Sequence, residues 1–176
     1  ATASCLPGPM DNAFFDANSG FTSASKTVTL NSNVYIHDIT FSGSPVPPVL
    51  QIFTGSLNIY GSSEWQSGMQ VFQPGTLASI YYQNTGEAKT IKSNGVIPFT
   101  RTGANVGIII NETNSITLLD DFKAYDYLYI NSGSFNTNGF KVTSNYIYAN
   151  SGKTTTLNLG SSHLYVGYFY TNNAAT

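Results

Sequence analysis

Short runs in which apolar and polar residues alternate cover most of the chain. Such period-two runs predict β-strands, because successive side chains of a strand point to opposite faces. The runs are rich in Val, Ile, Thr, Tyr and Phe, and Ser-Gly, Asn-Gly, Thr-Gly and Pro-Gly pairs separate them. No uninterrupted helical periodicity is found, so the sequence predicts an all-β fold. The predicted strands are Thr27–Leu30, Val34–Phe41, Leu50–Phe53, Leu57–Tyr60, Met69–Phe72, Leu77–Tyr82, Thr90–Lys92, Val96–Thr100, Val106–Ile110, Ser115–Leu119, Tyr125–Ile130, Phe140–Thr143, Asn145–Tyr148, Thr154–Leu159 and His163–Tyr170.

Turn glycines recur at a nearly constant spacing. The first three of them lie twenty residues apart and the last two nineteen apart. These glycines are Gly55, Gly75, Gly95, Gly133 and Gly152. A period of about 20 residues suits one coil of a parallel β-helix, in which like positions stack about 4.8 Å apart. We therefore predict a right-handed parallel β-helix, or solenoid, with Leu57, Leu77 and Ile97 stacked on one inner face; a β-sandwich is the alternative.

The two ends of the chain differ from its middle. Residues 1–25 are rich in turn residues and are predicted to form an N-terminal cap or a lead-in from a preceding domain, while residues 26–176 form the solenoid. Ser42–Pro48 holds three of the seven prolines and is predicted to be a loop that leaves the coil. Leu164–Tyr170 is largely apolar on both faces, and a terminal strand of this kind is prone to association. We expect that the chain continues past Thr176 or that another subunit stacks there.

The charged share of 9% is far below the roughly 25% of an ordinary domain. Seven scattered Lys and Arg residues and a net charge of -2 leave no basic patch, so nucleic acid is not an expected partner. Apolar runs such as Val106–Ile110 are too short to span a bilayer. His37 and His163 lie far apart without a cysteine or carboxylate at ligand spacing, and Cys5 is the only cysteine. No metal or cofactor is predicted, and a polar but uncharged surface is typical of a secreted β protein.

Adjacent carboxylates at Asp120 and Asp121, with Lys123 and Asp126 close in sequence, are the most enzyme-like feature. Paired carboxylates can bind calcium or share acid and base roles, and a polysaccharide lyase would need such acids beside a cation. The alternative is that the carboxylates cap a tight turn by accepting backbone N–H groups. We favour the structural role and predict no catalytic residues.

Tyrosines alternate within several of the predicted strands. On a β-helix, one parity of each strand fills the core and the other lines an outer face. Outward tyrosines could form a platform for sugar rings; the alternative is that they supply cross-rung packing and strand propensity. The tyrosines predicted to face a ligand are Tyr125, Tyr127, Tyr129, Tyr146 and Tyr148.

Five segments of the sequence have a recognisable pattern: Ser115–Phe122, Leu128–Thr143 and Thr156–Ser162, together with Asp11–Asp16 and Thr27–Asn33. In these segments the chain resembles the repetitive β-solenoid cell-surface proteins of Bacteroidetes. These proteins are very large, secreted, and similar to gliding-motility adhesins and other surface filaments. The resemblance implies a class and an extracellular, cell-surface location, and it does not imply an activity. The chain departs from the pattern at Ser115, where a tryptophan is usual, and over Glu87–Arg101.

These observations favour a non-catalytic structural or adhesive module of a large secreted cell-surface protein. Its expected partners are neighbouring repeats or subunits of the same protein, and surface polysaccharide. One alternative is a carbohydrate-active β-helix enzyme that uses Asp120, Asp121 and Lys123. A second alternative is a self-assembling extracellular filament subunit.

Overall fold

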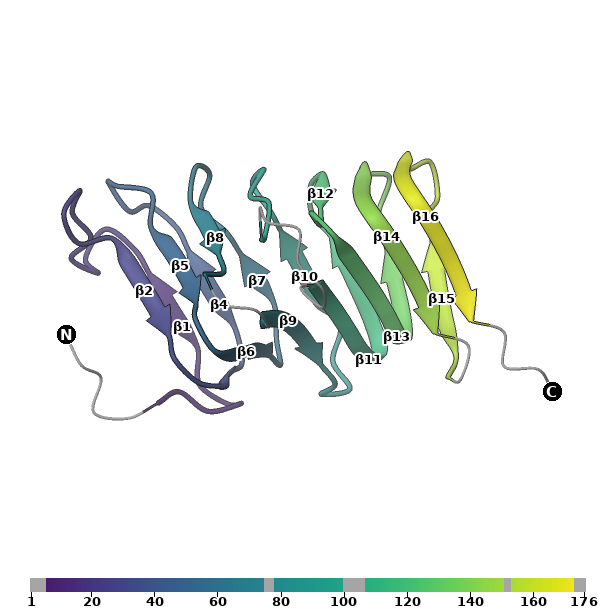
Figure 1. The fold of residues 1–176 in the computed structure, drawn as a ribbon. Coiled ribbons are helices and arrows are strands. Elements are labelled where there is room, and N and C mark those ends of the chain that lie inside the picture. Colours follow the sequence, from purple (N-terminus) through teal and green to yellow (C-terminus); the bar gives the residue numbers. More distant parts are fainter. Residues whose placement is uncertain (1–5, 75–77, 100–106, 151–152, 173–176) are drawn as a thin grey trace.

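The computed structural model describes residues 6–74, 78–99, 107–150 and 153–172. In these ranges the protein is all-β, and its strands stack as a parallel β-solenoid of about 7 turns of about 22 residues each. Figure 1 shows the rungs side by side, from the purple N-terminal strands to the yellow C-terminal ones. The predicted parallel β-helix is therefore confirmed, and the alternative β-sandwich is wrong, because every ladder between named strands is parallel.

Three ladders run along the solenoid, and the chain visits them in turn. The first ladder consists of β3 (Val34–Ile36), β6 (Gly55–Ile59), β9 (Ala78–Gln83), the start of β11 (Gly107–Leu118), the start of β13 (Tyr127–Asn136), and the ends of β14 (Val142–Asn150) and β16 (Leu164–Asn172). The second consists of β1 (Ala13–Phe15), β4 (Ile39–Phe41), β7 (Ser63–Glu64), β10 (Lys89–Lys92), the ends of β11 and β13, and β15 (Thr155–Asn158). The third has two parts, β2 (Thr27–Leu30) with β5 (Val49–Ile52) and β8 (Gln70–Phe72), and β12 (Phe122–Lys123) with the starts of β14 and β16.

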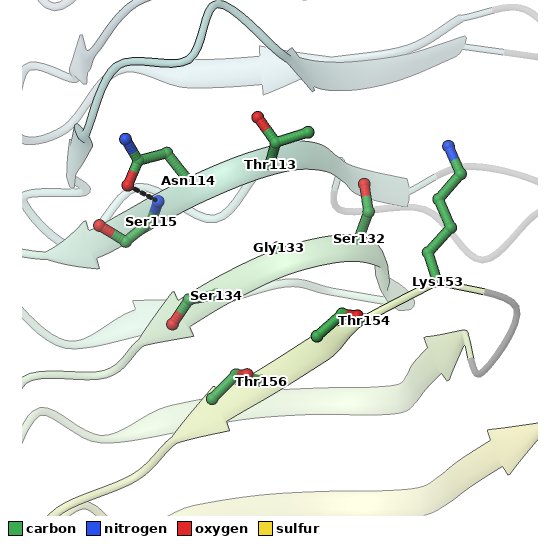
Figure 2. A pocket seen from close by; sticks show the side chains of 9 residues that line it. All are labelled: Thr113, Asn114, Ser115, Ser132, Gly133, Ser134, Lys153, Thr154 and Thr156. Carbon is green, nitrogen blue, oxygen red and sulfur yellow. Dashed lines mark hydrogen bonds between the residues drawn. The ribbon is translucent and has the colours of Figure 1, made fainter.

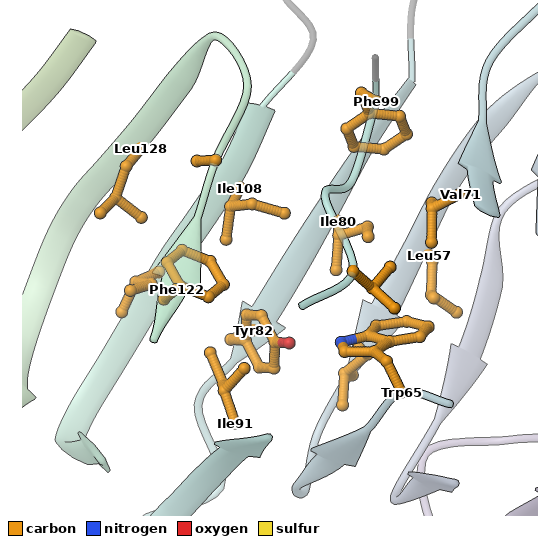
Figure 3. Packing of buried hydrophobic residues seen from close by; sticks show 14 of the residues in the cluster. Leu57, Trp65, Val71, Ile80, Tyr82, Ile91, Phe99, Ile108, Phe122 and Leu128 are labelled. Carbon is orange, nitrogen blue, oxygen red and sulfur yellow. The ribbon is translucent and has the colours of Figure 1, made fainter. Parts of the chain in front are cut away.

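One apolar column forms the centre of the core on the first ladder. Its members are register partners on successive rungs, and each is at most 2% exposed. They are Leu57, Ile80, Ile108, Leu128 and Ile147, and Figure 3 shows the first four of them among the buried side chains. Parallel pairing places like residues at like depth, so each rung buries the apolar side chain of the one before it.

The predicted stack of Leu57, Leu77 and Ile97 is wrong in its register. Leu57 pairs with Ile80, which lies 23 residues further along the chain, and Ile97 is half-buried outside any strand. Leu77 lies outside the described residues. The rungs differ in length, so a constant period of twenty residues drifts out of register with the ladder.

Other differences have local causes. The predicted strand Val96–Thr100 is absent over its described part, 96–99, where only Pro98 makes an isolated bridge, to Val71. Pro98 has no N–H to donate, and Phe99 has a φ of 59°, which a strand cannot accommodate. Two of the predicted strands, over 106–110 and 115–119, fall in one long strand, β11, over residues 107–110 and 115–118, and this strand belongs to two ladders. The short strands β1, β7 and β12 were not predicted; β1 lies within residues 1–25 and pairs with β4.

Polar side chains also form a column across four rungs. The amide of Gln83 donates to Asn58 at 2.8 Å, that of Asn111 donates to Gln83 at 3.4 Å, and that of Asn131 donates to Asn111 at 2.9 Å. Each amide both donates and accepts, so like residues can stack without leaving a polar atom unsatisfied.

Replacement of a core residue tests the observed register. Ile108→Ala removes buried methyl groups from the central column and is expected to reduce the free energy of unfolding by about 2–5 kcal/mol. Ile109→Ala is the matched control, because Ile109 is the next residue of β11, points outward and is only half-buried. Urea unfolding monitored by circular dichroism should show a clearly smaller loss for the control. Equal losses would contradict the assignment of inner and outer positions.

Candidate functional site

Six tyrosines form a two-column array on the outer side of the first ladder. They come in Tyr-x-Tyr pairs from β13, β14 and β16, and the residue between each pair belongs to the inward-facing parity. The tyrosine array consists of Tyr127, Tyr146 and Tyr168 in one column and Tyr129, Tyr148 and Tyr170 in the other. In-register parallel pairing is what brings these residues together from positions about 20 residues apart.

The rings stack on one another along the solenoid axis. In the first column the ring centroids lie 4.8 Å and 5.1 Å apart, and in the second 4.9 Å and 4.8 Å apart. Interplanar angles in the columns are 11–17°. The ring centroids of the two tyrosines on one strand lie 5.5 Å apart on β13, 6.3 Å apart on β14 and 6.1 Å apart on β16. Offset stacking of this kind stabilises each aromatic pair by about 0.5–1.5 kcal/mol beyond its burial.

The stacking decides which part of each ring faces outward. Because neighbours on adjacent rungs occupy the ring faces, the array presents ring edges and phenol hydroxyls instead. The four tyrosines of β13 and β14 are half-buried, whereas Tyr168 and Tyr170 are 54% and 43% exposed. The rungs of β13 and β14 therefore do not present the platform of open ring faces that the sequence suggested.

Four of the five tyrosines predicted to face a ligand lie in the array. The fifth, Tyr125, lies in a bend before β13, is 37% exposed and belongs to neither column. Tyr168 and Tyr170 were missed as site residues. The signal that could have found them is the third copy of the Tyr-x-Tyr pair, 22 residues after Tyr146 and Tyr148.

Three phenols of the array, those of Tyr127, Tyr129 and Tyr148, have a raised pKa. Burial, and then the negative charge of Asp126, raise the pKa of Tyr127 above its ordinary value. Burial followed by the neighbouring tyrosines raises the pKa of Tyr129 and Tyr148 as well. Burial also raises the pKa of Asp126 itself. The phenol hydroxyls of the array can both donate and accept hydrogen bonds.

The first column of the array stops at β11 for a steric reason, whereas in the second column Ile109 of β11 is the register partner of Tyr129. Gly107 is the register partner of Tyr127 on the preceding rung. A Cβ at Gly107 would lie 3.0 Å from the carbonyl oxygen and 3.1 Å from the Cβ of Tyr127. The column of rings therefore begins at β13, and a glycine fills the position before it.

Asp120 and Asp121 bind backbone amides on opposite neighbouring rungs. The carboxylate of Asp120 accepts from the N–H groups of Ser93 at 2.7 Å and Asn94 at 2.5 Å, on the preceding rung. The carboxylate of Asp121 accepts from the N–H of Lys141 at 2.9 Å, on the following rung. The two carboxylates are thus directed to different turns and do not converge on a common point.

A carboxylate that accepts a backbone N–H group of a neighbouring rung also occurs elsewhere in the solenoid. Asp38 accepts from the N–H of Ser62 on the next rung at 2.6 Å. Asp126 is buried, and Lys123 is exposed on the third ladder. Carboxylates that cap the turns of a neighbouring rung serve to satisfy backbone groups that no strand pairs.

A shallow groove of about 450 Å³ lies on the second ladder and was not predicted. Figure 2 shows its lining, in which hydroxyl side chains come from three successive rungs. Ser115, Ser134 and Thr156 are register partners, and Lys153 lies at one end. The lining residues are Thr113, Asn114, Ser115, Ser132, Gly133, Ser134, Lys153, Thr154 and Thr156. We refer to them as the hydroxyl groove.

Comparison with protein-family models, with curated proteins and with solved structures finds no match for the chain. Among the described residues, no group of three or more His, Cys, Asp or Glu side chains is placed to hold a metal ion. His37 contacts Asp38 at 3.4 Å and Glu87 at 3.7 Å, and His163 lies exposed on a distant rung. In the same described ranges there is no helix of the length and apolarity needed to cross a membrane.

The turn-capping role of Asp120 can be tested directly. Asp120→Asn replaces one acceptor oxygen with an NH₂ group that faces a backbone N–H, and it should reduce stability by about 1–3 kcal/mol. Asp121→Asn is the control and should cost less, because its single backbone bond is exposed and an Asn oxygen can keep it. Urea unfolding of both variants measures the difference. An Asp120→Asn protein as stable as the parent would contradict the capping role.

Alkaline pH is expected to destabilise the protein through its tyrosines. Burial strongly raises the pKa of Tyr82, whose hydroxyl lies 2.7 Å from the Ser63 hydroxyl. A phenol with a raised pKa keeps its proton in the folded state while the unfolded chain loses it, so stability falls as the pH rises above about 10. Urea midpoints measured at rising pH should decrease, and less steeply in Tyr82→Phe. A midpoint independent of pH in this range would contradict the prediction.

Proposed function

We propose that the chain is a non-catalytic structural and adhesive module whose tyrosine array binds polysaccharide. The observation that carries the proposal is the array itself, six phenols in two regular columns on an outer face. A solenoid supplies a rigid, repetitive surface, which suits a ligand that is itself repetitive. The low charge of the chain and its resemblance to Bacteroidetes surface proteins support a secreted, cell-surface location.

The chemistry of the array favours a polyhydroxylated partner. Phenol hydroxyls donate and accept, as sugar hydroxyls do. The outward ring edges carry the positive part of the aromatic quadrupole, and so attract oxygen lone pairs. The half-buried rings lose little side-chain freedom on binding, because the stacking already orders them.

The hydrogen bonds of the acidic residues support a non-catalytic role. Acid and base catalysis on a sugar needs two carboxyl groups that flank one bond. Asp120 and Asp121 instead cap turns on opposite rungs. The alternative of a carbohydrate-active enzyme that uses these residues and Lys123 would require them to leave their backbone partners.

A retention assay tests the proposal. The parent protein is mixed with insoluble polysaccharides of several kinds, and the bound fraction is measured after sedimentation. Tyr146→Phe combined with Tyr148→Phe removes two hydroxyls from the central rung but keeps the ring stacking, and should weaken retention about tenfold, as expected for two lost hydrogen bonds. Tyr165→Phe is the matched control, since Tyr165 is 58% exposed on β16 but lies on the third ladder. Retention that is absent in the parent, or unchanged in the double variant, would contradict the proposal.

A self-assembling filament subunit is the second candidate, and the exposed aromatic residues of β16 favour it. Among the described residues β16 is hydrogen-bonded only to β14, and Phe169, the register partner of Ile147, is 48% exposed. Edge strands with apolar surface pair readily with another chain. Phe169→Lys should abolish concentration-dependent association in sedimentation velocity, whereas Tyr35→Lys, near the opposite end, should not. A parent chain that stays monomeric at high concentration would remove this candidate.

A further inference from the structure

We infer that the ligand of the tyrosine array is a neutral, extended, equatorially β-linked glycan of the cellulose type. It lies along the solenoid axis with successive sugars on successive rungs. This inference rests on the proposed function and specifies its substrate class. It follows from the spacing, the orientation and the charge of the array, which are independent observations.

The spacing of the array sets the repeat of its ligand. Ring centroids recur every 4.8–5.1 Å along each column, over three rungs. One sugar of a fully extended β-linked chain has nearly this length, so each added sugar meets the next pair of tyrosines. The α-linked glucans coil instead, and their sugars cannot follow a straight column for three rungs.

The orientation of the rings sets the mode of contact. Since the tyrosine rings of neighbouring rungs stack on one another, a sugar cannot lie flat on their ring faces. The glycan must contact ring edges and phenol hydroxyls with the hydroxyls on its own edges. In an equatorially linked chain those hydroxyls project outward along both sides of a flat ribbon, toward two columns whose rings lie 5.5–6.3 Å apart.

The charge around the array favours a neutral glycan. Asp126 is a buried carboxyl group directly before Tyr127 in the chain, and after burial its negative charge contributes to the raised pKa of Tyr127, Tyr129 and Tyr148. The same field repels the carboxylates of an acidic polysaccharide. No cation belongs to the array itself, so nothing in it compensates that repulsion.

Titration with defined oligosaccharides tests the inference. Isothermal titration calorimetry with cello-oligosaccharides from the disaccharide to the hexasaccharide should show affinity that rises with each sugar until the ligand spans three rungs, and then levels off. Malto-oligosaccharides of equal length should bind at least about tenfold more weakly. Equal affinity for the two series, or affinity that does not depend on length, would overturn the inference.

A variant in the tyrosine pair of β16 tests whether each sugar binds to one rung. Tyr168→Phe combined with Tyr170→Phe removes the hydroxyls of β16 and should shorten the length at which affinity levels off by one sugar. Tyr165→Phe on the same strand should leave the length dependence unchanged. A double variant with reduced affinity but an unchanged plateau would contradict the rung-by-rung arrangement.

The outcomes separate the inference from the proposed function. If insoluble polysaccharides of another class are retained through the array while cello-oligosaccharides are not bound, the adhesive role stands and the inference fails. If no polysaccharide of any class is retained, both fail. Urea unfolding of each variant shows whether a loss of binding reflects a loss of fold.

Discussion

In-register parallel pairing between successive rungs is the constraint on which the rest of the structure depends. Like positions of neighbouring rungs lie about 4.8 Å apart, so a residue type that recurs at one position becomes a continuous column. Inside, this produces the apolar column from Leu57 to Ile147. Outside, it produces the tyrosine array, and it also pairs Gln83 with Asn111 in the amide column. Core and candidate site are two results of one pairing rule.

The same rule explains the unusual composition. A column of identical ionised side chains at this spacing would repel itself, whereas columns of Tyr, Asn, Ser or Thr are mutually compatible. A charged share of only 9% is therefore what extensive stacking of like residues requires. Several charged side chains of the described residues are paired or bind backbone amides, as in the 2.8 Å contact between Lys92 and Glu64 and in the amide bonds of Asp120. A surface with few charges follows directly from this way of building a solenoid.

The sequence predicted the parts of the fold that depend on local pattern, and missed those that depend on register. Alternation identified most strands and the inward parity of Leu57, but Ile80 rather than Leu77 proved to be its partner, because rung length varies. The left-handed backbone at Phe99 gave no signal in an apolar run. Tyr127 and Tyr146 were predicted to point outward, yet the stacking of their rings could follow only from the three-dimensional register. The hydroxyl groove was missed because Ser115, Ser134 and Thr156 look like ordinary solvent-facing residues until their rungs are aligned.

Disulfide trapping of the tyrosine register tests the central claim most directly. In a background with Cys5, the only cysteine, replaced by Ser, the pair Tyr127→Cys and Tyr146→Cys places two thiols at register partners. Their Cα spacing of about 4.8 Å falls within the range a disulfide accepts, whereas the diagonal pair Tyr127→Cys and Tyr148→Cys lies beyond it. The account predicts rapid, near-complete oxidation of the first pair and little of the second, measured by thiol titration. Preferential oxidation of the diagonal pair, or of neither, would contradict the parallel register on which the array and the core both depend.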